Sequence, residues 1–287
     1  MGEAKNAKRF YLTLDFEEDL GSAAPSATFY SHKGTPRFIE RVLAHDWKIT
    51  IFVTGQILAE QPELIEPYRA HPDRFSFGLH AYDHRDVFNR EAQLSNVERG
   101  LKAYADFFGR PPLIYRAPNG MLLRGQLLRL VDNGVLAGSN FFPCWFPGRF
   151  DYSHVPRTPF RVEGTDFIEM PFSVTRLPRI PIALSYHQLF GRTLLTQLAS
   201  FDRPSSIVFD FHLHDLFPET WYNTIPISRG MKMAYYQASR PGRAIELFER
   251  LTADYAGKGY VFADLHDYLH ELRSGSIDEV SLARLYP

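Results

Sequence analysis

The stretch Phe77-Gly78-Leu79-His80-Ala81-Tyr82-Asp83-His84 joins a short apolar run to two histidines that are four residues apart. The run over residues 75–79 has the length of a buried strand, and the histidines follow its end. Imidazole is the commonest side-chain metal ligand, so the pair predicts two ligands of one metal site. Ordinary core or surface histidines are the alternative for an isolated pair.

Three further polar clusters follow other apolar runs. They are Asp15-Phe16-Glu17, Arg116-Ala117-Pro118-Asn119-Gly120 and His212-Leu213-His214. Enzymes of the barrel type gather their active sites from strand ends that are distant in sequence. The four clusters together therefore favour a catalytic metal site over isolated histidines.

Apolar runs alternate with helical patterns along the whole chain, which predicts parallel βα units in a single domain, 1–287, with a core at about 10–272. The expected strands are 10–14, 49–53, 75–79, 113–115, 136–142, 167–170, 207–213 and 260–263. The expected helices are 35–46, 62–71, 94–108, 125–133, 242–255 and 265–272. Two segments rich in aromatic residues, 142–161 and 217–241, are expected to be long loops of which at least one borders the active site.

Composition excludes several other classes. The formal net charge of -1 provides no field of the whole protein for binding nucleic acid or an anionic membrane, and no run of like charge indicates a local basic patch. Cys144 is the only cysteine, no stretch has the length of a membrane span, and no signal-like segment is found, so we expect a cytoplasmic protein.

The acidic cluster offers a base and a third metal ligand. Asp15 and Glu17 fall on one face of an extended chain and Phe16 on the other. One carboxylate can then bind the metal while its neighbour takes a proton from water. Glu18 and Asp19 follow directly and remain rival ligands.

The other two clusters offer charge and proton transfer. Arg116 would orient the acidic base, and the backbone N–H of Asn119 would point at the reacting carbonyl oxygen. If the strand continues to residue 213, Asp210, His212 and His214 share one face, which makes a histidine general acid available.

With these residues, the chain resembles the polysaccharide deacetylases, the metal-dependent family-4 carbohydrate esterases. The resemblance covers residues 11–272 and includes Thr50-Ile51-Phe52-Val53-Thr54-Gly55 and Lys258-Gly259-Tyr260-Val261-Phe262. It implies a distorted (β/α)7-type barrel with long loops over its C-terminal face. Asp15 matches the catalytic base, Arg116 the arginine that orients it, and His214 the acid. His80, His84 and Glu17 match the ligands of one divalent ion, usually zinc, with cobalt, nickel or manganese as alternatives.

Three positions depart from the family pattern. Phe16 stands where most members have a metal-binding aspartate, Ala81 replaces a small hydroxyl residue, and the tryptophan-bearing motif has no clear match near residues 139–141, with Trp145 a loose candidate. The expected activity is removal of an N-acyl group, acetyl above all, from an amino sugar that is nucleotide-linked, lipid-linked or part of an oligosaccharide. A precursor of surface polysaccharide fits best. The alternatives are a deformylase, a cyclic amide or imide hydrolase, and an inactive glycan-binding barrel.

Overall fold

The computed structural model describes residues 8–21, 27–85, 89–201, 204–224, 239 and 241–287. Its centre is a sheet of 10 strands in the order β10-β1-β2-β3-β4-β5-β9-β8-β12, with β11 paired to the start of β1. The strands are β1 (Lys8–Phe16), β2 (Ile49–Val53), β3 (Phe75–Leu79), β4 (Ile114–Tyr115), β5 (Ala137–Gly138), β8 (Phe160–Val162), β9 (Ile168–Glu169), β10 (Ser206–His212), β11 (Tyr260–Phe262) and β12 (Asp278–Val280). Pairing is parallel except between β8 and β9.

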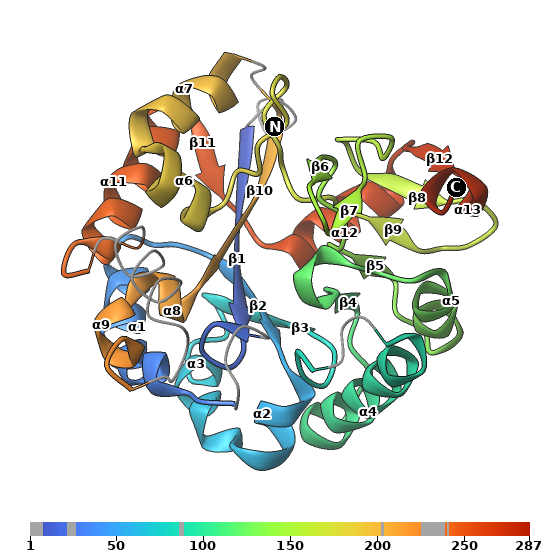
Figure 1. Cartoon of the computed structure of the whole chain (residues 1–287), viewed down its shortest axis with the longest axis horizontal. Helices are drawn as coiled ribbons and strands as arrows, with labels where there is room; N and C mark the ends of the chain where they lie inside the picture. Colours follow the sequence, from blue (N-terminus) through green and yellow to red (C-terminus); the bar gives the residue numbers. More distant parts are fainter. Residues whose placement is uncertain (1–7, 22–26, 86–88, 202–203, 225–238, 240) are drawn as a thin grey trace.

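The sheet curls into a half-barrel with helices around its outside (Figure 1). The α-helices are α1 (Thr35–Ala44), α2 (Gly55–Glu60), α3 (Glu66–Arg69), α4 (Arg90–Phe108), α5 (Arg124–Asp132), α6 (Leu184–Phe190), α7 (Arg192–Phe201), α8 (Leu213–Leu216), α9 (Pro218–Trp221), α11 (Ala244–Gly257), α12 (Leu265–Ser274) and α13 (Leu282–Leu285). Short 3-10 turns are η3 (Tyr30–Gly34), η4 (Pro62–Leu64) and η5 (Pro118–Gly120). The predicted distorted barrel is confirmed. No helix in the described ranges has both the length and the apolar character to cross a bilayer.

Strand alternation separates an outer core from an inner face. On β1, Phe10, Leu12, Leu14 and Phe16 belong to the large outer cluster beneath the helices. Tyr11 points inward and joins a smaller cluster, which Leu265 and Leu269 of α12 also enter. This cluster fills the inside of the half-barrel on the side of the amino ends of the strands. Polar inner-face residues such as Asp15 therefore gather at the carboxyl ends of the strands.

Several predicted elements differ from those in the structure. The helix expected over 62–71 is divided into η4 and α3, because Pro67 has no N–H to donate to the carbonyl oxygen of residue 63 and so interrupts a continuous helix. The strand expected over 136–142 contains only β5, after which the chain turns to place polar residues around the site. The strand expected over 207–213 ends at His212, where α8 begins. The core also extends past residue 272, since Val280 and Leu285 are buried in the outer cluster.

Candidate active site

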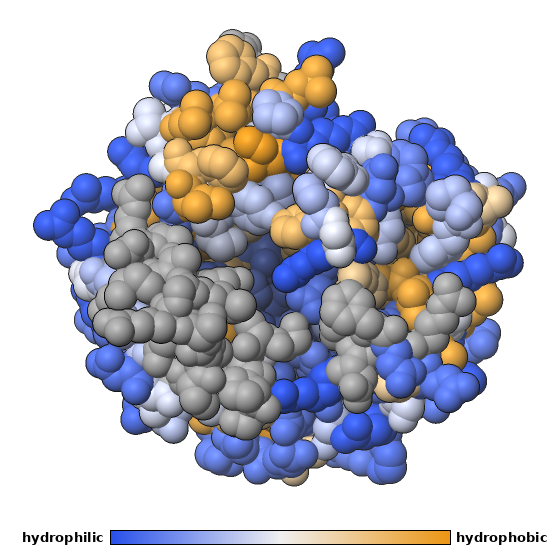
Figure 2. Space-filling model, viewed as in Figure 1, coloured by the Kyte–Doolittle hydropathy of each residue, from blue (hydrophilic) through white to orange (hydrophobic). Residues whose placement is uncertain are grey.

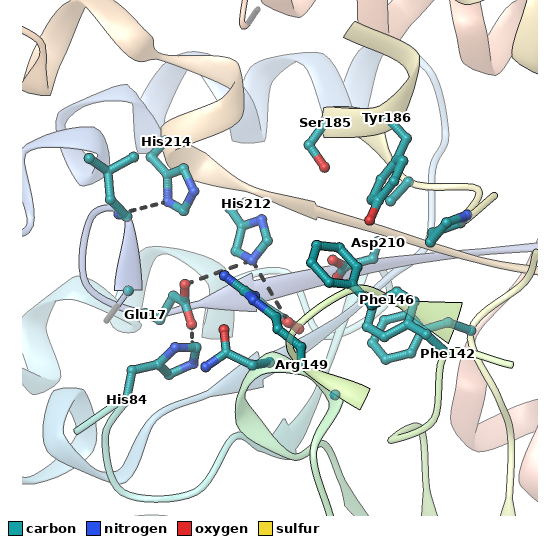
Figure 3. Close-up of a pocket in the computed structure, with 18 of the residues that line it drawn as sticks. Glu17, His84, Phe142, Phe146, Arg149, Ser185, Tyr186, Asp210, His212 and His214 are labelled. Carbon is teal, nitrogen blue, oxygen red and sulfur yellow. Dashed lines mark hydrogen bonds and ion pairs between the residues drawn. The ribbon is translucent and has the colours of Figure 1, made fainter. Parts of the chain in front are cut away.

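A pocket opens where the inner-face strand ends meet, and its lining combines carboxylates, histidines and aromatic rings. Figure 2 shows a hydrophilic hollow in this face of the molecule, and Figure 3 shows the pocket in close-up. Its lining includes the predicted residues Asp15, Glu17, His84, Asn119 and His214. His80 and Arg116 lie in the wall beneath them, fully buried and in contact with these residues. All seven predicted site residues therefore meet in one place.

Glu17, His80 and His84 converge through single atoms. Oε2 of Glu17 forms an ion pair with Nε2 of His84 and lies 3.2 Å from Nε2 of His80. The two imidazole Nε2 atoms are 2.8 Å apart. Burial disfavours ionisation of Glu17, but His84 and His80 outweigh it and hold the pKa of Glu17 well below its usual range. The predicted trio therefore forms one cluster of donor atoms.

These donors fit a divalent metal ion. Oε2 of Glu17 is buried, and the Nε2 atoms of both imidazoles face it. Nδ1 of His80 donates to the carbonyl oxygen of Arg116 over 3.0 Å, so the lone pair of its Nε2 faces the cluster. Two imidazoles and one carboxylate form a ligand set of catalytic zinc sites. One donor atom from each of the three buried residues lies within 4.8 Å of the other two, which is close enough for one ion to contact all three.

The loop between the two histidines is fixed by helices α2 and α4. The first N–H groups of α2, those of Gly55 and Gln56, donate to the carbonyl oxygens of Ala81 and Tyr82 at 2.9 and 2.8 Å. Oδ1 of Asn96, on α4, accepts from the N–H groups of Tyr82 and Asp83. Ala81 has a left-handed φ of 53°. Hydrogen bonds from both helices thus hold a backbone conformation that is uncommon for alanine.

Gly100 allows this approach of α4 to the loop. A Cβ atom at Gly100 would lie 2.7 Å from the carbonyl carbon of Ala81 and 2.9 Å from the amide nitrogen of Tyr82. Only glycine lets the helix backbone come so close. Gly100 therefore permits the close contact between α4 and the loop that carries the two histidines.

Arg116 links two carboxylates on neighbouring strands. Its Nη1 donates to Oδ1 of Asp15 over 2.7 Å and to Oδ1 of Asp210 over 2.8 Å. Its Nε and Nη2 donate to the carbonyl and hydroxyl oxygens of Ser139. The predicted contact between Arg116 and Asp15 is present. Burial, and then the charge of Asp15, raise the pKa of Asp210 to about 7.

Aromatic rings hold the arginine from both sides. The guanidinium carbon of Arg116 lies 4.1 Å from the ring centre of Phe52 and 4.3 Å from that of Phe172. Such stacking on flat faces fixes the guanidinium plane. Asp15 is thereby held in one orientation at the pocket floor.

The turn that carries Asn119 is supported from below. Asn119 has a left-handed φ of 55°, and the turn's own hydrogen bonds use the N–H groups of Gly120 and Met121 rather than that of Asn119. Oδ1 of Asn140 accepts from the N–H of Ala117. The carboxylate of Glu169 accepts from the backbone N–H and the side-chain amide of Asn140 and from the backbone N–H of Phe141. Burial raises the pKa of Glu169 to about 7. Sequence reasoning missed this buried support, because polar residues on short strands have no distinctive pattern.

His212 and His214 occupy different positions. His212 ends β10, and its Nδ1 bonds to Oδ2 of Asp215 over 2.9 Å while its Nε2 lies 3.7 Å from Glu17 and 4.0 Å from Asp15. His214 lies in α8, so the shared strand face predicted for these two histidines is wrong. Its Nδ1 accepts the N–H of Leu20 over 3.2 Å. Its ring nevertheless stacks on that of His212, with centres 4.6 Å apart.

The electrostatics also separate the two histidines. Burial lowers the pKa of His212, but its hydrogen bond to Asp215 and the charge of Asp210 outweigh this and raise that pKa well above its usual value. Burial and then the neighbouring His212 lower the pKa of His214. His212 therefore holds a proton more tightly than His214 does. The short Asp215 spacing after His212 is a sequence signal that could have indicated this.

The rival acids have other surroundings. Asp19 accepts hydrogen bonds from the N–H groups of Tyr30 and Ser31 at 2.6 and 2.9 Å and from the hydroxyl of Thr28. It thus caps the chain entering η3. Glu18 is buried with neither carboxylate oxygen hydrogen-bonded, and burial raises its pKa. Glu17 alone among the three faces both histidines.

The segment 142–161 borders the pocket, as predicted for at least one of the aromatic loops. Strands β6 (Trp145–Phe146) and β7 (Phe150–Asp151) form a hairpin within it, and Phe142, Phe146, Arg149 and Phe150 line the pocket. Trp145 is 66% exposed and does not line the pocket, so it gives the tryptophan-bearing motif no counterpart there. Most of the other loop, 217–241, lies outside the described residues.

Comparisons with known proteins show what the sequence and the fold are similar to. A family model described as polysaccharide deacetylase matches residues 2–135. Two similar solved structures are assigned as polysaccharide deacetylases. The protein from Mycobacterium smegmatis is 14% identical with a TM-score of 0.59, over 98% of this chain and 96% of that one. The protein from Pseudomonas aeruginosa PAO1 is 12% identical with a TM-score of 0.61, over 94% and 92%.

A third similar structure is PuuE allantoinase, which is 13% identical with a TM-score of 0.61 over 94% of this chain and 92% of that chain. No curated protein matches the sequence. At these identities the solved structures show the fold alone. Together with the family model, they confirm the resemblance that the motifs predict.

Proposed function

We propose that this chain, which resembles the polysaccharide deacetylases, is a metal-dependent hydrolase that removes an N-acyl group, most simply acetyl, from an amino sugar. The observation that carries the proposal is the convergence of Glu17, His80 and His84 beside the Asp15–Arg116 pair in one pocket. A deacetylase needs a metal site and a base within reach of the same carbonyl carbon.

The ligands in this proposal are Glu17, His80 and His84, and the ion is zinc, with cobalt, nickel or manganese as alternatives. When bound, such an ion supplies Lewis acidity for the acyl oxygen and lowers the pKa of water. Asp15 receives the proton of the attacking water at Oδ2, because Oδ1 is already bonded to Arg116. Arg116 keeps that carboxylate in place, and the N–H of Asn119 donates to the developing oxyanion.

Protonation of the leaving amine falls to a histidine. The motif match assigns this role to His214, whereas the geometry favours His212, since its Nε2 faces Asp15 and Glu17 while Asp215 holds its Nδ1. The variants His212→Gln and His214→Gln distinguish them. Loss of the true acid should slow amide hydrolysis by about 10²–10⁴-fold but spare an activated aryl acetate ester, whose leaving group needs no proton.

The substrate class rests on the same resemblance. We propose an amino-sugar precursor of surface-polysaccharide synthesis in the cytoplasm, nucleotide-linked or lipid-linked, rather than a finished polymer. The test is release of acetate and formate from a panel of nucleotide-linked and lipid-linked N-acyl amino sugars and chitooligosaccharides, with and without added zinc or cobalt. We expect acetate release that depends on the metal.

Variants connect this activity to the cluster. Glu17→Ala should lose one bound metal ion per chain, whereas Glu18→Ala should keep it, because only Glu17 faces the two histidines. Asp15→Asn should keep the metal but lose turnover. Release of neither acetate nor formate from any member of the panel would overturn the proposed reaction.

A second function has one observation in its favour, since an allantoinase shares this fold over nearly the whole chain. A cyclic amide or imide hydrolase needs the same attack of water on a C–N carbonyl. Ring opening of a cyclic amide without acetate release would establish it in place of the deacetylase. An inactive glycan-binding barrel would instead be indicated by two results together. The purified protein would contain no metal ion, and Asp15→Asn would bind glycans with the affinity of the wild type.

A further inference from the structure

Arg149 is a basic side chain at the pocket that the catalytic chemistry leaves unused. It lies in the turn between β6 and β7, where its N–H donates to the carbonyl oxygen of Phe146 over 3.1 Å. The hairpin register pairs Phe146 with Phe150, so both rings and the arginine project from one short, defined structure. Figure 3 shows the side chain extending from the hairpin toward the group that contains Glu17 and His212.

The charge of Arg149 has no counterpart within the described part of the protein. Among the pocket-lining residues that the structure describes, it is the only lysine or arginine. Its side chain contacts the ring of Phe146, whose centre lies 5.1 Å from the guanidinium carbon. Arg116, by comparison, is buried and bonded to two carboxylates. Arg149 is exposed and free to pair with a ligand.

The wall beside Arg149 is aromatic. Phe142, Phe146, Phe150 and Phe172 line the same pocket, and the rings of Phe142 and Phe172 stack with centres 3.7 Å apart. Flat apolar rings suit the apolar face of a sugar. A pyranose against this wall would have the metal-ligand cluster on one side and the guanidinium on another.

From this arrangement we infer that the substrate carries an anionic group, a phosphate or a carboxylate, which Arg149 binds while the N-acyl group faces Glu17, His80 and His84. A guanidinium offers two parallel N–H donors that match the paired oxygens of either anion. This inference rests on the proposed function and narrows its substrate from amino sugars in general to those that are negatively charged. It makes Arg149 a specificity residue rather than a catalytic one.

The test compares matched substrates and variants. Acetate release is measured for N-acetylglucosamine, its 1-phosphate, its nucleoside diphosphate form and N-acetylmuramic acid. The last three substrates carry a phosphate monoester, a diphosphate and a carboxylate, so they distinguish these anions from one another. The variants are Arg149→Ala and Arg149→Lys, with Arg110→Ala as the control. Arg110 is also exposed but precedes β4, at the opposite end of the strands from the pocket.

We expect kcat/KM for at least one anionic sugar to exceed that for N-acetylglucosamine. Arg149→Ala should reduce the preference for the anionic sugar, that is, its kcat/KM divided by that for N-acetylglucosamine, by about tenfold to one-hundredfold, the effect of one charge-assisted contact. Arg149→Lys should restore part of it, and Arg110→Ala should leave it unchanged. Equal activity on charged and neutral sugars, or equal losses for both in Arg149→Ala, would overturn the inference and leave the deacetylase proposal intact.

A binding measurement covers the case in which no acetate is released. Glucosamine 1-phosphate and glucosamine are titrated calorimetrically into the wild type and Arg149→Ala. Binding of the phosphate that weakens about tenfold or more in the variant would support the anion site even though the reaction had failed. Binding that does not differ between the two proteins would refute the anion site, whereas the proposed reaction is tested separately by acetate release.

Discussion

Replacing Gly100 with alanine should destabilise the protein and weaken its metal binding, although alanine is the better helix former. The new Cβ would lie 2.7 Å from the carbonyl carbon of Ala81 and 2.8 Å from its oxygen. Carbon atoms in contact are normally about 3.5–4.0 Å apart, so roughly 1 Å of movement is needed. Both obstacles belong to the backbone between the two histidines and cannot rotate away.

Two opposing energies set the magnitude. Alanine in a helix interior gains about 1 kcal/mol over glycine. Forcing extra volume into a packed site costs about 1–3 kcal/mol. The difference is a net loss of about 0–2 kcal/mol in the free energy of unfolding, and we expect its upper half because rigid backbone opposes the new methyl group. Displacement of Ala81 also moves His80 relative to His84, so zinc affinity should fall about 10–100-fold, as for other changes in the groups that orient metal ligands.

The assay is denaturant unfolding of the metal-free protein, together with competitive zinc titration. Gly257→Ala is the matched control, since Gly257 ends helix α11 with no strained φ, and a Cβ added there would meet no atom within 4 Å. That variant should be equally or more stable and should bind zinc normally. Gly100→Ala with wild-type stability and wild-type zinc affinity would refute the idea that helix contact sets the spacing of the histidines.

Three further substitutions test the buried supports of the site. Arg116→Lys keeps the charge but loses the hydrogen bonds of the planar guanidinium to Ser139. It should lower the free energy of unfolding by about 1–3 kcal/mol and strongly reduce turnover. Unchanged stability and turnover would refute the orienting role of Arg116. Asp19→Asn should lower stability by a similar amount, because Asp19 caps η3. Elemental analysis should still find one metal ion per chain in this variant. Loss of the ion would identify Asp19 as a ligand. Burial raises the pKa of Glu169 to about 7 from an ordinary 4.5, so the folded state holds the proton more tightly and wild-type stability should fall as pH rises from 4.5 through 7. In Glu169→Gln that part of the pH dependence should vanish from unfolding curves, and its persistence would assign it to another group.

Much of the site could be predicted from sequence because it depends on strand alternation. Asp15 and Glu17 follow the period of β1, and Phe16 between them is buried in the outer core, so one pattern placed both acids in the pocket. The contact between Arg116 and Asp15 was expected from the family resemblance rather than from alternation, and it is present in the structure. The carboxyl ends of neighbouring parallel strands lie at the same edge of the sheet, so polar residues that directly follow these strands lie close together.

The remaining features depend on where strands end and on contacts distant in sequence. Alternation fails for His214 because α8 begins one residue after His212, and no apolar pattern marks such a short helix. Glu169 supports the Asn119 turn through Asn140, a chain of contacts that no local spacing encodes. Arg149 enters the pocket only because a hairpin of two-residue strands turns it there.

The ion pair between Glu17 and His84 has a consequence for how the site would be loaded. Burial opposes a charge on His84, but Glu17 outweighs it and raises the pKa of that imidazole, so the pair retains a proton where a metal ligand needs a lone pair. A metal ion must therefore exchange with this proton, and its apparent affinity should rise with pH until His84 is neutral. Calorimetric zinc titrations in buffers of different ionisation enthalpy would measure the proton released. Glu17 and His84 would then share a proton in the metal-free protein and would both be ligands in the metal-bound protein.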